Sequence, residues 1–276
     1  MIEDIEKYQK AGKEIFNKLH LSTYPVAIKY IKSVDEIPNG VKRPVDEGKK
    51  MCICQTFTMA RRHGHTIAIT AVDNFCTPST VGHGWVQISK EEFVESQIRQ
   101  GWHKDKKAEE RRAERVYEKQ FNKVKDLGYF GLISSPLLKT LVIPDSILIY
   151  GTGTKITNII HALCFEHKKR YLPSSSFEGF GESCGKGAFR PFLLQRPQIV
   201  IPGAGDRAFA GIQDHEIAIG FPANHIFYIL KNLFKTGASQ GIGFPARQLI
   251  PLGLDENITP GFKYMQELID KKLKKD

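Results

Sequence analysis

Residues 144–154 have the sequence PDSILIYGTGT, and this stretch decides the fold class of the chain. The apolar run SILIY is typical of a buried strand, and GTGT predicts a turn. The next segment, 156–165, places three isoleucines and a leucine on one helical face. The stretch therefore predicts a strand, a turn and a helix in that order, as in α/β proteins.

The last third of the chain repeats this plan. Apolar runs predict strands over residues 198–201 and 216–220, and a helix follows over 222–234. The glycine- and proline-rich segment 241–260 predicts irregular structure. A short helix over 262–274 is expected to close the chain.

The segments before the central stretch alternate in the same way. Apolar residues at helical spacing predict helices over residues 2–20 and 52–62. β-Branched and aromatic runs predict strands over 24–31 and 66–72. Helices and strands therefore interleave through most of the sequence.

A long helical segment lies between the two halves. Residues 90–126 predict one helix, or two that join near Gly101, and 128–135 predicts a turn-rich connection. We expect an α/β fold, with mixed α+β as the alternative, around one central mixed sheet flanked by helices. We expect a single domain over residues 1–276, with 89–127 as a helical insertion.

Composition narrows the functional classes. With 276 residues, of which 41% are hydrophobic and 25% charged, the chain can bury a core without disulfides or a structural metal. Residues 1–7 lack the basic and apolar regions of a secretory signal. No apolar run reaches the roughly 18 residues that a membrane helix needs. We therefore expect a cytoplasmic protein with no membrane contact.

The net charge of +10 favours a negatively charged partner. The densest charged segment, Lys104–Arg115, holds six basic and four acidic residues, so its own net charge is only +2. Mixed charge of this kind is typical of a solvated surface and argues against nucleic-acid binding. We expect a small anionic ligand or a redox partner protein, and homo-oligomerisation is left open.

Five cysteines carry the main functional signal: Cys52, Cys54, Cys76, Cys164 and Cys184. Their odd number and wide spacing argue against a disulfide framework. Cys164 falls on the apolar side of a predicted helix, so we expect it in the core. For the other four, metal ligation, a reactive thiol and simple burial are all open.

Cys52 and Cys54 stand at the start of a predicted helix, where backbone N–H groups and the helix dipole favour a thiolate. Residues two apart point to different sides of a helix. Both cysteines could then bind one metal only on an irregular turn. We therefore expect one functional cysteine, Cys54, and one packing cysteine, Cys52.

Cys76 and Cys184 lie in segments rich in small residues. Cys76 opens CTPSTVGHG, whose exposed backbone N–H groups suit an anion, and His83 within it is a further candidate ligand. Glycines flank Cys184 and would allow close backbone approach to a cofactor. Three or four thiolates suit an iron–sulfur cluster or zinc, but no C-x-x-C spacing distinguishes them.

Two glycine-containing loops are alternative ligand sites. Near the Gly203–Arg207 loop, Asp206, Arg207 and Glu216 form a charged cluster that could orient an anionic ligand or merely lock the loop. This loop lacks the third glycine of the dinucleotide-binding fingerprint. The Gly151–Thr154 turn could hold a phosphate at a helix N-terminus or be an ordinary turn.

Several of these residues, taken in order, resemble the prokaryotic domain-of-unknown-function family 169. They are Cys54 ahead of Ala60-Arg61, Cys76 after a strand, Pro144-Asp145 before a strand, Cys184, and Gly205-Asp206-Arg207 followed by Glu216 and Pro222. The resemblance implies a single domain from archaea or bacteria, many of them anaerobes, and implies no catalytic mechanism. Where members of that family carry a cysteine just before Gly-Asp-Arg, this chain has Gly203-Ala204, so a four-cysteine site needs Cys52.

The leading hypothesis is a thiolate-bound metallocofactor protein with a redox-linked, oxidoreductase-type role. An iron–sulfur cluster of the 4Fe–4S type would be bound by Cys54, Cys76 and Cys184, with Cys52 or His83 completing the set; zinc is the alternative metal. The second hypothesis is a non-redox module that binds a small anion or a partner through the Gly203–Arg207 loop. Whether the chain is an enzyme is left open. The first hypothesis requires that distant thiols meet in the fold.

Overall fold

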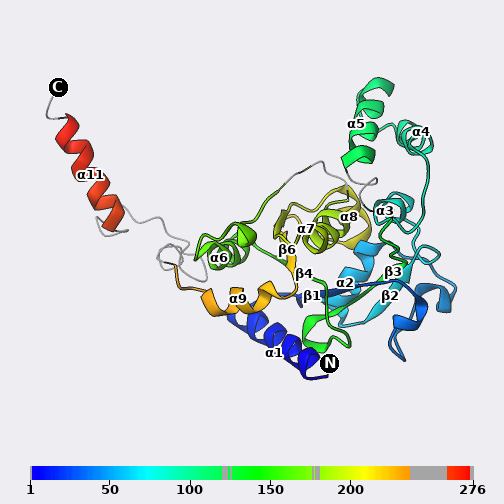
Figure 1. Cartoon of the computed structure of the whole chain (residues 1–276), viewed down its shortest axis with the longest axis horizontal. Coiled ribbons are helices and arrows are strands. Elements are labelled where there is room, and N and C mark those ends of the chain that lie inside the picture. Colours follow the sequence, from blue (N-terminus) through cyan, green and yellow to red (C-terminus); the bar gives the residue numbers. More distant parts are fainter. Residues whose placement is uncertain are drawn as a thin grey trace.

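The computed structural model describes residues 2–119, 124, 126–175, 177, 181–236 and 260–273. Its centre is one six-stranded sheet with helices packed on both faces (Figure 1). The described residues form ten α-helices in addition to this sheet, so the expected mixed α/β class is confirmed. The division into one domain with an insertion over residues 89–127 stays a prediction.

The strands lie in the order β2-β3-β1-β4-β6-β5. All five neighbouring pairs are antiparallel, whereas we expected a mixture of parallel and antiparallel pairs. The order of strands and helices along a chain does not by itself set strand direction, which explains the difference. The strands are β1 Val26–Ile31, β2 Ile67–Thr70, β3 Gly131–Pro136, β4 Ser146–Gly151, β5 Gln198–Val200 and β6 Ile217–Pro222.

Most helices agree with the sequence prediction within a few residues. They are α1 Ile2–Lys18, α2 Ile53–His63, α3 Thr77–Gly82, α4 Lys90–Gln100, α5 Lys106–Lys119, α6 Gly153–Cys164, α7 Arg190–Leu194, α8 Ala204–Ala210, α9 His225–Asn232 and α11 Pro260–Leu273. The predicted join near Gly101 is the left-handed residue that ends α4. Most of the irregular segment predicted over 241–260 lies outside the described residues.

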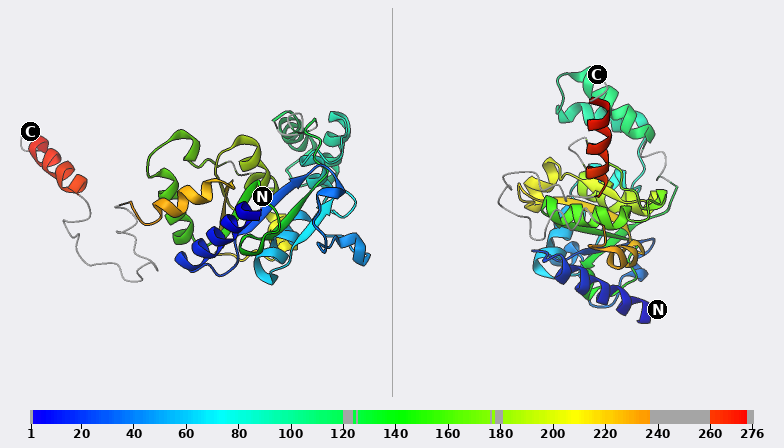
Figure 2. Two further views of the ribbon diagram at one scale, coloured as in Figure 1. Left: turned by 60° about the horizontal axis from the view of Figure 1, so that its bottom comes forward. Right: turned by 90° about the vertical axis from the view of Figure 1, so that its left-hand side faces the viewer.

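Two apolar clusters cover the two faces of the sheet. On β4, Ile147 and Ile149 point to one face, while Leu148 and Tyr150 point to the other. Helices α1, α6 and α9 cover the first face, and α1 and α9 lie side by side (Figures 1 and 2). Helix α2 and a π-helix, Glu182–Phe189, cover the second face. We call these the α1/α9 face and the α2 face.

Strand β3 lies where we expected a turn-rich connection. Its sequence GLISSP contains a glycine, two serines and a proline, which are poor strand formers. All six residues are nevertheless buried, because β3 pairs with β1 on one side and β2 on the other. Tertiary pairing overrides local propensity here.

Two peripheral features complete the described chain. Helices α4 and α5 pack together through Phe93 and Ala113, in agreement with the predicted helical segment. Helix α11 has no buried residue. No helix within the described ranges is both long enough and apolar enough to span a lipid bilayer.

Candidate functional site

Four of the five cysteines lie on the α2 face of the sheet. Cys52, Cys54 and Cys184 belong to one buried apolar cluster, and Cys76 packs against it. The sulfur atoms of Cys52 and Cys54 are 3.0 Å apart. Burial raises the pKa of the Cys184 thiol, and the charges of Cys76 and Cys52 add to that shift. We call these four residues the thiol cluster.

The closeness of Cys52 and Cys54 comes from the start of α2. The helix begins at Ile53, and Cys52 is its N-cap with extended backbone, φ −88° and ψ 158°. The expectation that the two side chains point apart is wrong, because that rule applies only within a helix. The Cys52 backbone N–H donates to Gln55 Oε1 at 2.9 Å and thereby stabilises this start.

Cys76 follows β2 through the predicted turn. Asn74 Oδ1 accepts the Cys76 backbone N–H at 3.0 Å. The Cys76 carbonyl then accepts backbone N–H groups from Ser79 and Thr80, so the segment forms α3 instead of the expected loop. Cys76 is half-buried, whereas Cys52, Cys54 and Cys184 are buried, so Cys76 is the most solvent-exposed thiol of the cluster. The neighbouring Phe75 ring is exposed as well.

Cys184 lies in the π-helix Glu182–Phe189, where we expected a glycine-rich loop. Two glycines bring this helix onto the sheet: a Cβ added to Gly220 of β6 would stand 1.7 Å from the Gly187 carbonyl oxygen. One added to Gly187 would stand 2.9 Å from Leu148 Cδ1. The π-helix backbone therefore packs directly against β6 and β4. This contact fixes the position of Cys184 on the α2 face. π-Helical segments are rare and are frequently found at functional sites.

Asp206 connects the segments around the thiol cluster. Its Oδ2 accepts the backbone N–H of Gly203 at 2.9 Å and that of Ser183 at 3.2 Å. The second bond joins the start of α8 to the π-helix. The predicted Gly203–Arg207 loop is therefore mostly the first turn of α8, because the Asp206 carboxylate caps that turn. Cys54 Sγ lies 4.0 Å from the Gly205 carbonyl oxygen.

Burial and mutual contact shift the thiol pKa values in different directions. The hydrogen bond from the Cys54 thiol lowers the pKa of Cys52 below its ordinary value, against the effect of burial. The same contact, together with burial, raises the pKa of Cys54. Burial also raises the pKa of Cys184, and the Asp206 carboxylate adds to that shift. Of these three thiols, Cys52 is the one whose ionisation is favoured, because the hydrogen bond from the Cys54 thiol stabilises its charge while burial opposes it.

His83, the further candidate ligand, is buried beside Cys184. Its Nδ1 lies 2.7 Å from the Ser79 carbonyl oxygen and its Nε2 lies 3.3 Å from the Cys184 carbonyl oxygen. Burial lowers the pKa of His83 to about 4, so the ring is neutral at pH 7. Both ring nitrogens face backbone oxygens, and metal ligation would require the ring to leave one of them.

Three buried hydroxyls surround the thiol cluster, and sequence analysis did not single them out. They belong to Tyr30 on β1, Tyr150 on β4 and Ser183 next to Cys184, and none has a hydrogen-bond partner among the described residues. The Tyr30 phenol lies within the influence of the Cys184 charge, and the Tyr150 phenol within that of Cys54. Tyrosines in apolar strands are ordinarily core residues, so the sequence contained no signal for this role.

The four thiols and His83 do not form a closed metal site in the side-chain positions of the structure. Across the part of the chain that the structure describes, no group of three or more His, Cys, Asp or Glu side chains is arranged to hold a metal ion. Cysteine side chains turn between staggered positions about one bond, so a site formed by these thiols would be completed on metal binding.

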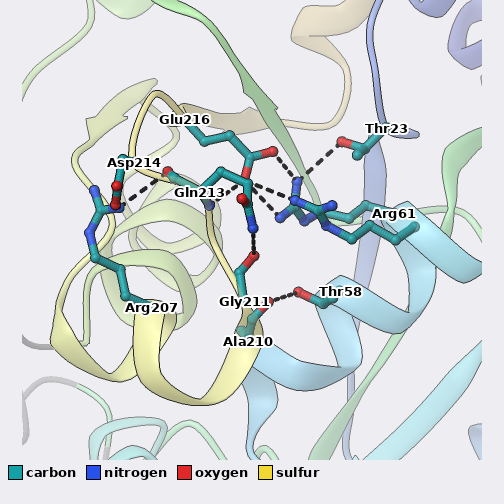
Figure 3. A network of polar contacts seen from close by, with 10 residues as sticks. Thr23, Thr58, Arg61, Arg207, Ala210, Gly211, Gln213, Asp214 and Glu216 are labelled. Atoms are coloured by element: carbon teal, nitrogen blue, oxygen red, sulfur yellow. Dashed lines mark hydrogen bonds and ion pairs between the residues drawn. The ribbon is translucent and has the colours of Figure 1, made fainter.

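A buried ion pair between Arg61 of α2 and Glu216, one of the predicted ligand residues, lies near the surface loop before β6 (Figure 3). Arg61 donates to both carboxylate oxygens of Glu216, at 2.6 and 3.0 Å, and Arg62 donates to one of them at 3.2 Å. The Arg61 guanidinium carbon also lies 4.4 Å from the centre of the Tyr150 ring. Glu216 thus joins α2 to the segment before β6.

The remaining predicted site residues lie apart from the thiols. Arg207 is at the surface, where its guanidinium donates to the Gln213 carbonyl at 3.1 Å (Figure 3). The Gly151–Thr154 turn leads into α6, as expected, on the α1/α9 face. Cys164 ends α6 and is half-buried, so the expectation of a core position is wrong; the helix ends there, and its last turn is only partly covered. Anion binding at either loop stays a prediction.

The fold and site define a class of α/β protein in which a buried group of thiols lies on one face of an antiparallel sheet. The model of the DUF169 family, described as "Uncharacterised ArCR, COG2043", matches residues 14–232. The chain belongs to this family. It is also 24% identical over 221 residues to "Uncharacterized protein MJ0308" of Methanocaldococcus jannaschii, covering 79% of this chain and 90% of that protein. No solved structure matches the chain.

Proposed function

We propose that the thiol cluster binds an iron–sulfur cluster of the 4Fe–4S type and that the protein has a redox function. One observation carries the proposal: Cys52, Cys54, Cys76 and Cys184 come from three separate segments and share one apolar cluster on the α2 face. Cys164 lies at the end of α6, whose core residues face the other side of the sheet. Four thiolates are the ligand set of a 4Fe–4S cluster.

The surroundings of the thiols support this assignment. Cys52, Cys54 and Cys184 are all less than one-tenth exposed, and their neighbours in the α2-face cluster are mainly apolar. Thiols with raised pKa values, such as Cys54 and Cys184, are inert nucleophiles at neutral pH. A metal reverses this, because it displaces the thiol protons on binding. The burial of three thiols is thus better suited to a bound cofactor than to attack on a substrate.

Zinc is the alternative metal, since four thiolates also form structural zinc sites. The test is anaerobic purification followed by iron, zinc and acid-labile sulfide analysis with visible spectra. We expect a brown protein with about four irons and four sulfides per chain. Stoichiometric zinc without iron would replace the iron–sulfur assignment. A colourless protein with neither metal after anoxic reconstitution would contradict the proposal.

The 3.0 Å contact between the Cys52 and Cys54 sulfurs favours a second candidate, a dithiol redox pair. The Cys52 thiolate would attack a disulfide supplied by a partner, and Cys54 would then resolve the mixed disulfide. Each turnover would convert two thiols to one disulfide and transfer two electrons and two protons to the partner. Peptide mass analysis after treatment with oxidised glutathione tests this. A Cys52–Cys54 disulfide in metal-free protein would support the pair, and two unchanged thiols would exclude it.

A further inference from the structure

The hydroxyls of Tyr30 and Tyr150 are buried in an apolar cluster, where a phenylalanine ring would avoid an unpaired O–H group. Both side chains are at most 2% exposed, and neither O–H has a hydrogen-bond partner among the described residues. Phe57 and Phe189 occupy the same apolar cluster, and the Phe189 ring centre lies 4.9 Å from that of Tyr30. Buried polar groups are nearly always paired, so two unpaired phenols in one cluster indicate a missing acceptor.

Both tyrosines belong to the apolar cluster that contains Cys52, Cys54 and Cys184, and they lie at opposite ends of their paired strands. Tyr30 is at the end of β1 and lies within the influence of Cys184; its ring centre is 6.3 Å from that of His83, which contacts the Cys184 carbonyl. Tyr150 is on the neighbouring strand β4 and lies within the influence of Cys54. The charges of different cysteines of the thiol cluster thus act on the two phenols.

The protein positions each ring firmly. The Tyr30 ring packs against the rings of Phe189 and Phe192, with centres 4.9 and 5.1 Å away. The Tyr150 ring lies under the Arg61 guanidinium at 4.4 Å. The Ser183 hydroxyl lies near the Tyr150 phenol and the Asp206 carboxylate and lowers the pKa of both groups, although neither hydroxyl has a partner in hydrogen-bond geometry. Fixed rings with free O–H groups are preorganised donors.

We propose that the Tyr30 and Tyr150 hydroxyls donate hydrogen bonds to sulfur atoms of the cofactor bound by the thiol cluster, an inference that rests on the proposed function. The acceptors would be thiolate or inorganic sulfide sulfurs. A hydrogen bond to sulfur stabilises the more negative, reduced state of an iron–sulfur cluster and therefore raises its reduction potential. The two tyrosines would be positioning residues that tune the cofactor.

The test uses Tyr30→Phe, Tyr150→Phe and the double variant, with Tyr8→Phe as control. Tyr8 is buried on the α1/α9 face, away from the thiols. In cofactor-free protein we expect the two site variants to melt at or above the temperature of the unchanged protein, because each loses only an unpaired O–H. In reconstituted protein we expect each to melt lower and to have a more negative midpoint potential, with the larger shift in the double variant.

The outcomes separate this inference from the proposed function. If the unchanged protein takes up neither iron nor zinc, the proposed function and this inference both fail. If it takes up iron, and both single variants keep the same potential and melting temperature as the Tyr8→Phe control, only this inference fails. If it takes up zinc alone, the readout is chelator competition, for which we expect roughly a tenfold loss of affinity per variant. An unchanged zinc affinity would overturn the inference.

Discussion

The two faces of the sheet are built from different chemistry. On the α1/α9 face, the described core is a continuous set of apolar side chains from β1, β4, β6 and three helices. On the α2 face, the same strands contact three buried thiols, a buried arginine and two tyrosines with unpaired hydroxyls. The helices of the first face also carry buried polar side chains, in Asn158, His225 and Asn232. The second face differs in its group of cysteines and in the buried Arg61–Glu216 ion pair.

The largest expected difference between the faces concerns Arg61. Replacing it by alanine leaves Glu216 buried without its main partner, so we expect a loss of about 3–5 kcal/mol in unfolding free energy. The control, Lys18→Ala, breaks an exposed pair with Glu14 on α1, and we expect about 0.5 kcal/mol or less there. Urea denaturation measures both. A loss below about 1 kcal/mol for Arg61→Ala would remove the contrast.

The glycine contact between the π-helix and β6 gives the next largest effect. Gly220→Ala places a methyl group against the Gly187 carbonyl, so we expect overpacking to cost about 1–3 kcal/mol or more. Because the π-helix must move, cofactor content should fall as well. Gly153→Ala is the control, since an added Cβ there meets no atom within 4 Å. Equal stability and cofactor content in the two variants would show that the contact does not position Cys184.

A smaller effect is the pH dependence that Glu216 contributes. Burial opposes its ionisation, but hydrogen bonds from Arg61 and Gln213 and the charges of both arginines outweigh it, so its pKa lies below 4.5. A lowered pKa in the folded state gives stability that is present above the unfolded value of 4.5 and is lost as pH falls towards the folded value. Glu216→Gln should flatten this part of the acid profile. Parallel acid profiles for the two proteins would contradict the assignment.

The smallest expected effect is on the labelling rates of the two half-buried thiols, Cys76 and Cys164. Without cofactor, we expect iodoacetamide to label both before the three buried cysteines, because access limits the reaction. After reconstitution, Cys76 should be protected by ligation while Cys164 keeps its labelling rate. Mass spectrometry of the labelled peptides measures the difference. Protection of Cys164 to the same degree would mean that cofactor binding does not distinguish the two faces.

Periodicity in the sequence predicted most of the secondary structure but not the pairing. The strand at 146–150 and the helices over α1, α2 and α9 follow from apolar spacing alone. β3 was missed because its serines and glycine disfavour a strand until two neighbours pair with it. α8 was missed because its first turn depends on Asp206, whose carboxylate also bonds to Ser183, 23 residues earlier. Contacts between distant segments cannot be obtained from local pattern.

The candidate site was predicted in its residues and only partly in its geometry. The helix start indicated Cys54, the small-residue segment after it indicated Cys76, and flanking glycines indicated Cys184. The contribution of Cys52 was underestimated, because a shift of one residue in the helix start changes the direction of its side chain. Tyr30 and Tyr150 carry no signal in one sequence, since only the absence of a partner in the folded chain distinguishes them from core residues.

Iron and sulfide content, measured cysteine by cysteine, tests the central claim that four thiols share one bound group. Each cysteine is replaced by serine in turn, and each variant is reconstituted without oxygen beside the unchanged protein. We predict that Cys52→Ser, Cys54→Ser, Cys76→Ser and Cys184→Ser each lose most of the bound iron, while Cys164→Ser keeps it. Equal iron content in all five variants, or none in the unchanged protein, would contradict the account.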